Sequence, residues 1–73
     1  MPYVNVRITR GATSEQKERI VAGVTQVLVD VLGKNPERTF VVIDEVDTDN
    51  WGIGGETVTK RQQRQEQSTS GNQ

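Results

Sequence analysis

The chain has 73 residues and contains neither cysteine nor histidine. Without cysteine, a disulfide framework and zinc sites built on thiolates are excluded. Without histidine, the chain lacks the commonest general base and the commonest metal ligand of proteins. Metal chemistry is therefore not expected, and acid–base chemistry has to use another group.

An excess of either charge is also missing, since nine basic residues stand against ten acidic ones and give a formal charge of -1. Proteins that bind the phosphate backbone of nucleic acids depend on an excess of positive charge, so we predict no nucleic-acid partner. No apolar run approaches the roughly 20 residues that span a bilayer, and the amino end has no apolar signal-peptide core. We predict a soluble, cytoplasmic protein that binds no membrane.

What the chain does have is a proline directly behind the initiator methionine, as Met1-Pro2. If Met1 is removed, Pro2 presents a secondary amine whose proton affinity the surrounding fold can tune. If Met1 stays attached, that nitrogen is a tertiary amide and cannot act as a base. Among the individual residues of the chain, Pro2, through this nitrogen, is the strongest indication of function.

The first half of the chain predicts a strand followed by a helix. Residues 3–9 alternate apolar and polar side chains, which is typical of a strand with one buried face. Thr13 and Gln16 fit a capping box, so a helix should begin near Ser14. Its apolar residues recur at spacings of three and four, and Gly33 followed by Pro36 predicts its end.

A second strand is predicted over residues 39–43, a short β-branched run. Strands joined by a crossover of this length pair in parallel with a right-handed connection, so the fold class is α/β with a single β-α-β unit. The acidic residues 44–50 are interpreted as a solvated turn, because they lack the spacing of a calcium loop.

Residues 51–55, Trp-Gly-Ile-Gly-Gly, predict a turn or short hairpin. From Lys60 onward the chain has no apolar residue. We therefore predict one domain over residues 1–61 and a polar, disordered tail over residues 62–73.

Association is predicted from size and topology. A domain of about this length buries only about 60% of the surface of its unfolded chain, and a two-stranded sheet is marginal by itself. We expect a dimer with a continuous four-stranded sheet, with helices on one face and the other face buried in a higher oligomer.

Four features occur together at consistent spacing: Pro2 opening a strand, Gly followed by Ser-Glu-Gln-Lys at the helix start, Pro36 before the second strand, and the glycine-rich hairpin after Trp51. In this combination the chain resembles the 4-oxalocrotonate tautomerase family, the short-chain branch of the tautomerase superfamily. The resemblance covers residues 2 to about 61.

The resemblance implies a homohexamer, a trimer of dimers, in which the amino-terminal proline is the catalytic base in a small, largely apolar pocket near a subunit interface. It implies a keto–enol tautomerisation of a small unsaturated 2-oxo or 2-hydroxy acid, with no cofactor. Proton shuttling of this kind needs one group with a pKa near the working pH and a site that excludes water.

The chain departs from the family at two positions. Well-known members carry arginines where this chain has Ala12 and Phe40. Arg38, two residues before Phe40, shares its face if the strand is already regular there, and Arg10 precedes Ala12 in the loop; both are candidate substrate-binding residues. Arg7 is interpreted as an intersubunit ion-pair partner. Phe40 and Trp51 are predicted to wall the pocket, and without arginines Pro2 should be more basic than in relatives.

Two other interpretations stay open. One is a lyase or hydratase of the same superfamily, such as a dehalogenase that adds water to haloacrylates, which the missing arginines disfavour. The other is a catalytically idle homo-oligomer that keeps the fold as a binding module. An unreactive amine at Pro2 would distinguish the idle module from both enzymes.

Overall fold

The structure is a computed structural model and describes residues 1–68 of the chain. Its elements run, in chain order, as β1 (Tyr3–Thr9), α1 (Ser14–Leu32), β2 (Phe40–Val46), β3 (Gly52–Ile53), β4 (Glu56–Thr57) and α2 (Val58–Ser68). Two short 3-10 turns, η1 (Pro36–Arg38) and η2 (Thr48–Asn50), flank β2. None of the helices in this described range has the length and hydropathy to cross a bilayer.

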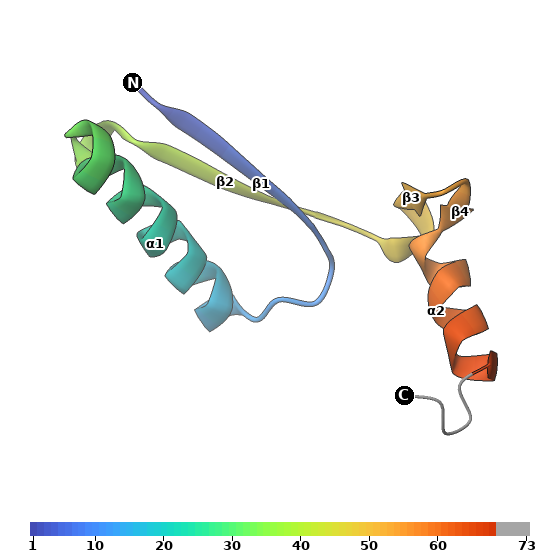
Figure 1. The fold of residues 1–73 in the computed structure, drawn as a ribbon. Coiled ribbons are helices and arrows are strands. Elements are labelled where there is room, and N and C mark those ends of the chain that lie inside the picture. Colours follow the sequence, from blue (N-terminus) through green and yellow to red (C-terminus); the bar gives the residue numbers. More distant parts are fainter. Residues whose placement is uncertain (69–73) are drawn as a thin grey trace.

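The predicted β-α-β unit is confirmed. Strands β1 and β2 pair in parallel, one residue to one, from Tyr3 with Phe40 to Thr9 with Val46. Helix α1 lies along one face of this two-stranded sheet (Figure 1). Because side chains alternate along a strand, Val4, Val6 and Ile8 share the helix-facing side, and their neighbours lie on the open side.

Helix α1 begins and ends as the sequence predicts. The Thr13 amide donates to the Gln16 side chain at 2.9 Å, and the Gln16 amide donates to the Thr13 hydroxyl at 3.1 Å. Gly33 adopts the left-handed conformation with φ 66°, and its amide donates to the carbonyl of Val29 at 2.9 Å. Both ends of the helix therefore satisfy backbone groups that a bare helix leaves unpaired.

Strand β2 is longer than predicted, and the prediction of an acidic turn from residue 44 on is wrong for its first residues. Asp44 and Glu45 continue the strand, where they pair in register with Arg7 and Ile8. Basic side chains distant in sequence neutralise both: Arg7 contacts Asp44 and Lys17 contacts Glu45. The sequence pattern does not reveal these partners, so the two carboxylates looked like loop residues.

The glycine-rich segment forms the predicted hairpin, with β3 and β4 antiparallel. Gly54 and Gly55 turn the chain with φ of 61° and 86°, a region that side-chain-bearing residues rarely adopt. The backbone amide of Val58 then donates to the carbonyl of Trp51 at 2.7 Å, which ties the start of α2 to the base of the hairpin.

Residues 62–68 differ from the disordered tail predicted for residues 62–73. Helix α2 continues to Ser68, and residues 69–73 lie outside the described residues. Lysine, arginine and glutamine are good helix formers. The Lys60 amide bonds the Thr57 hydroxyl at 3.1 Å, and Arg64 contacts Glu56 at 2.8 Å. Local propensity and these contacts form a helix that needs no apolar face.

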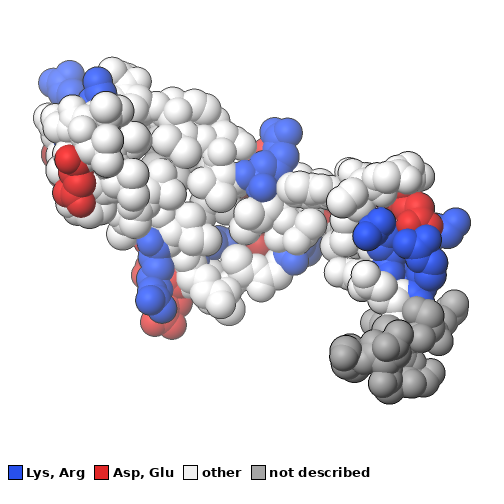
Figure 2. Space-filling model, in the orientation of Figure 1, with Lys and Arg blue, Asp and Glu red and all other residues white. Residues whose placement is uncertain are grey.

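The single chain leaves its sheet uncovered on the side opposite α1. No described side chain is fully buried, and Tyr3, Phe40 and Val42 on the open face are 62%, 50% and 44% exposed. Figure 2 shows charged side chains in separate groups over the sheet and α1, and a denser group of them over α2. An apolar face of this kind marks an interaction surface.

Candidate active site

Pro2 stands immediately before β1, and the sheet holds its backbone. Its carbonyl oxygen accepts a hydrogen bond from the amide of Phe40 at 3.0 Å, the first contact between the two strands. The residue is half-buried, while Met1 is 82% exposed and stands off the sheet. Removal of Met1 therefore disturbs no packed element and leaves the ring nitrogen at the end of the sheet.

Phe40 is the first residue of β2 and the register partner of Tyr3. Its ring lies on the open face together with Val42, and half of its surface is exposed. The structure thus bonds the backbone of Phe40 to that of Pro2, while the Phe40 side chain projects from the open face of the sheet.

Arg38 does not share the strand geometry of Phe40. It closes the 3-10 turn η1, and its amide donates to the carbonyl of Asn35 at 3.0 Å. Strand alternation begins only at Phe40, so the predicted common face of Arg38 and Phe40 is wrong. The cause is the segment Asn35-Pro36, whose side-chain cap and fixed proline φ favour a turn. Arg38 still lies in the turn that leads into β2, at the Pro2 end of the sheet, with an exposed side chain.

Arg10 and Trp51 lie at the other end of the sheet. The Arg10 amide follows β1 and donates to the carbonyl of Val46 at 3.0 Å, and its side-chain Nε lies 3.7 Å from Asp47 Oδ1. Trp51 follows η2 and is half-buried. Both residues come after the strands have ended.

The chain therefore separates its predicted site residues into two groups. Pro2 and Phe40 stand where the strands begin, and Arg10 and Trp51 stand where they end. Seven strand residues at about 3.3 Å each separate the groups by roughly 23 Å. Figure 1 shows the same arrangement, with the amino terminus at one end of the sheet and β3 beyond the other. One copy does not bring these residues together.

A hollow of about 280 Å³ lies at the Trp51 end, lined by Arg7, Val46, Asn50, Trp51 and Gly52. Arg7, interpreted from the sequence as an intersubunit ion-pair partner, makes an ion pair within the chain, with Nε and Nη2 at 3.1 and 2.9 Å from Asp44 Oδ2. A larger hollow, about 540 Å³, runs along α1 and contains none of the predicted site residues.

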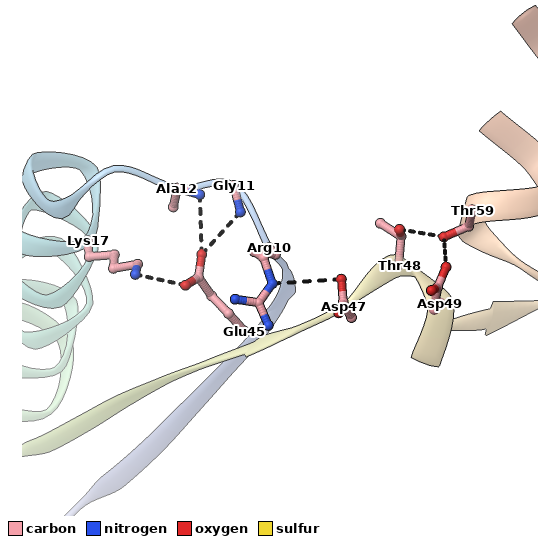
Figure 3. A network of polar contacts seen from close by, with 9 residues as sticks. All are labelled: Arg10, Gly11, Ala12, Lys17, Glu45, Asp47, Thr48, Asp49 and Thr59. Atoms are coloured by element: carbon pink, nitrogen blue, oxygen red, sulfur yellow. Dashed lines mark hydrogen bonds and ion pairs between the residues drawn. The ribbon is translucent and has the colours of Figure 1, made fainter. Parts of the chain in front are cut away.

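Glu45 fixes the loop between β1 and α1, as Figure 3 shows. One carboxylate oxygen accepts from the amides of Gly11 and Ala12, both at 3.2 Å, and the other lies 2.8 Å from Lys17 Nζ. The hydrogen bond from Lys17, then that from Gly11, lowers the pKa of Glu45 below its ordinary value. A strand carboxylate, missed in the sequence, thus sets the loop that carries Ala12.

Two hydroxyl groups and a carboxylate form a hydrogen-bonded network that fixes the turn before Trp51 (Figure 3). The Thr59 hydroxyl lies 2.6 Å from that of Thr48 and donates to Asp49 at 2.5 Å. Thr59 belongs to α2, and Thr48 and Asp49 belong to η2. Together with the bond from the Val58 amide to the Trp51 carbonyl, these contacts hold the indole-bearing turn against α2.

No group of three or more carboxylates within residues 1–68 is arranged to hold a metal ion. The groups that can do chemistry at the two ends of the sheet are the Pro2 nitrogen, once free, and the arginine side chains. An amine can exchange a proton, and a guanidinium can hold a carboxylate by paired hydrogen bonds.

Comparison with known proteins gives a consistent result. The family model described as tautomerase enzyme matches residues 2–61. A Dickeya dadantii (strain 3937) protein named as a probable tautomerase is 68% identical over 65 residues, which cover 88% of this chain and 97% of the relative. The 2-hydroxymuconate tautomerase of Bacillus subtilis (strain 168) is 34% identical over 59 residues, 81% of this chain and 95% of the relative.

Among solved structures, the crystal structure of DmpI from Helicobacter pylori superposes with a TM-score of 0.77 at 42% identity. The match covers 81% of this chain and 98% of that one. This structural match and the two sequence matches above are consistent with one another.

Proposed function

This chain belongs to the 4-oxalocrotonate tautomerase family of the tautomerase superfamily and is an isomerase, and we propose that Pro2 is its catalytic acid and base. The reaction is the interconversion of enol and keto forms of a small unsaturated 2-hydroxy or 2-oxo acid. It requires that Met1 be removed, so that the ring nitrogen of Pro2 is a free secondary amine.

The proton balance of the reaction is simple. The neutral prolyl nitrogen takes the proton from the 2-hydroxyl group of the dienol, and the electron pair moves through the conjugated system. The resulting ammonium returns the proton to a carbon further along that system, which leaves a 2-oxo acid and the neutral amine. No oxidant, reductant or cofactor enters this balance.

The observation that carries the proposal is the hydrogen bond between the Phe40 amide and the Pro2 carbonyl. It fixes the backbone of the residue that bears the nitrogen at the start of the sheet. A fixed position is what proton transfer to carbon demands of a general base, and exclusion of water is left to the assembly proposed below.

We further propose that the working form is a homohexamer, a trimer of dimers. Three observations support association. The open sheet face leaves Tyr3, Phe40 and Val42 exposed, and no side chain among the described residues is fully buried. The length of the sheet also separates Pro2 from Trp51. An antiparallel copy would bring its own Pro2 to the Trp51 end of this one and complete the site.

The test uses ultraviolet absorbance to follow ketonisation of 2-hydroxymuconate and phenylenolpyruvate. Intact mass first establishes that the mature protein begins at Pro2. Pro2→Ala, which keeps a free amine but a less suited one, should lower kcat/KM by about 100-fold or more. Lys34→Gln, an exposed change after α1, is the matched control and should keep full activity. Equal rates for wild type and Pro2→Ala would dismiss the proposal.

A further inference from the structure

We propose that Arg7 binds the substrate carboxylate in the hollow beside Trp51, and that the site takes monocarboxylic 2-oxo acids with a flat, apolar tail. The inference rests on the proposed function and names the substrate class of that same site. It assigns the binding of the acid group to a residue of β1, in place of the arginines absent at Ala12 and Phe40.

The first step is the composition of the hollow. Its five lining residues are Arg7, Val46, Asn50, Trp51 and Gly52. Arg7 is the one cation among them; Trp51 and Val46 are apolar. A volume of about 280 Å³ is at or below the lower end of ordinary ligand sites, which favours a small acid. One guanidinium beside an indole and a valine matches a molecule with one charged end and one apolar end.

The second step is the geometry of the guanidinium. Arg7 uses Nε and one Nη2 proton on a single oxygen of Asp44. A guanidinium has five N–H donors, so this pair of bonds occupies one edge and leaves the edge formed by Nη1 and Nη2 for a carboxylate. Asp44 thus acts as a positioning residue that sets the orientation of the fork.

The third step is the weakness of the ion pair as a stabilising contact. The side chains of Arg7 and Asp44 are 62% and 43% exposed. Exposed pairs contribute little to stability because water and salt screen them. Within the single chain, an arginine in this state can turn its free edge toward a ligand without the loss of a buried interaction.

The fourth step is the number of acid groups that the hollow can pair. Beyond Arg7, the one polar side chain among its lining residues is that of Asn50. Arg10, which follows β1, is not among the lining residues and faces Asp47. Within one copy, the residues that line the hollow offer no second cation to a second carboxylate. Monocarboxylates are therefore favoured over dicarboxylates.

Arg7 would act together with Pro2 of a second copy. Within one chain, five strand residues at about 3.3 Å each place Arg7 roughly 17 Å from Pro2. That distance is too long for a small acid to reach both groups. The hollow instead lies at the end of the sheet where the proposed antiparallel copy would place its own Pro2.

The test measures binding separately from turnover. Trp51 is the one tryptophan in the chain, so its fluorescence reports ligands in the hollow. The probes are 3-phenylpropionate and its uncharged amide, neither of which can tautomerise, added to the mature full-length protein. Wild type should bind the acid about tenfold more tightly than the amide, the value of one charge-assisted hydrogen bond.

Three variants separate ligand binding from a structural role. Arg7→Gln should lose the preference for the acid, and Lys34→Gln, the matched loss of charge after α1, should keep it. Asp44→Asn keeps a side-chain oxygen that can accept from Nε and Nη2 and so orient the fork, but it removes the neutralising charge; it should therefore bind the acid at least as tightly as wild type. A merely structural ion pair predicts equal losses in Arg7→Gln and Asp44→Asn, and that result overturns the inference, as does an acid preference that survives in Arg7→Gln.

Turnover distinguishes this inference from the function on which it rests. Wild type should convert phenylenolpyruvate, a monocarboxylate, with a higher kcat/KM than 2-hydroxymuconate, and Arg7→Gln should raise KM for phenylenolpyruvate more than it lowers kcat. If Pro2→Ala keeps full turnover while Arg7→Gln loses acid binding, the catalytic proposal fails and the binding residue stands. If Pro2→Ala loses turnover while Arg7→Gln changes neither binding nor KM, the role of Arg7 fails alone.

Discussion

The backbone amide of Phe40 lies 3.0 Å from the carbonyl oxygen of Pro2 and donates a hydrogen bond to it. This contact joins Pro2 to the first residue of β2, so the position of Pro2 depends on the pairing of the two strands. Residue 40 is therefore a position from which a substituted side chain can test the surroundings of Pro2.

Phe40→Arg should increase the fraction of Pro2 that is unprotonated at neutral pH, and so the fraction of the protein that can act as a base. A guanidinium near the amine disfavours its protonated form, so the acid limb of the kcat/KM profile should move to lower pH, by about one unit. Phe40→Leu is the control that removes the ring without adding charge, and it should leave the limb where it is. A limb that moves equally in both variants would contradict the assigned role of residue 40.

Glu45→Gln should destabilise the protein at neutral pH and much less in acid. The contacts of Glu45 with Lys17 and Gly11 lower its pKa in the folded state. They therefore stabilise the fold above the ordinary glutamate pKa, 4.5 here, and that contribution is lost as pH falls through the lower folded value. Urea midpoints of wild type and variant, at fixed protein concentration, should differ at pH 7 and converge below pH 4.5.

The converse pattern would remove Glu45 from this role. If the two midpoints stay equally far apart from neutral pH into acid, the carboxylate charge is not what holds the loop. Glu15→Gln is a suitable control, because Glu15 lies exposed in the first turn of α1.

Thr59→Val should loosen the turn that carries Trp51. The change keeps the shape of the side chain and removes the hydroxyl that bonds Thr48 and Asp49. We expect a loss of about 1 kcal/mol in the free energy of unfolding and a change in Trp51 fluorescence. Thr59→Ser retains the hydroxyl and should restore the fluorescence, whereas an unchanged spectrum in Thr59→Val would show that α2 does not position the indole.

Mixed assemblies test whether the site draws on two copies. Pro2→Ala and Trp51→Ala should each have low activity alone. When the two are unfolded together and reassembled, about one quarter of the sites should pair an intact Pro2 with an intact Trp51 from different copies. Ketonisation of phenylenolpyruvate should rise accordingly. A mixture no more active than its components would place both residues of each site in the same chain.

The sequence predicts those elements whose signals are local. The Thr13–Gln16 capping box, the Gly33 stop and the alternation along β1 lie within a few residues of what they determine, and the structure confirms them. The hairpin after Trp51 belongs to the same class, because its glycines are needed where φ is positive.

The features that the sequence does not predict depend on partners distant in the chain, or on helix propensity in a segment without an apolar pattern. Asp44 and Glu45 were read as loop residues because Arg7 and Lys17, which neutralise them, are far away in the chain. The condition under which Arg38 would share a face with Phe40 is not met, because Arg38 closes a 3-10 turn and β2 begins at Phe40. Helix α2 lacks the stripe of apolar residues by which a sequence indicates a surface helix, so its sequence does not predict it.

The central claim is a free prolyl amine that exchanges protons during catalysis, and nitrogen NMR of the protein labelled with ¹⁵N-proline tests it most directly. The chain has two prolines. Pro36, an amide within the chain, is an internal control that should not move with pH. Pro2 should resonate as an amine and titrate with the same midpoint as the acid limb of kcat/KM. A Pro2 signal in the amide region, or an amine whose titration does not match the kinetic limb, would contradict the account.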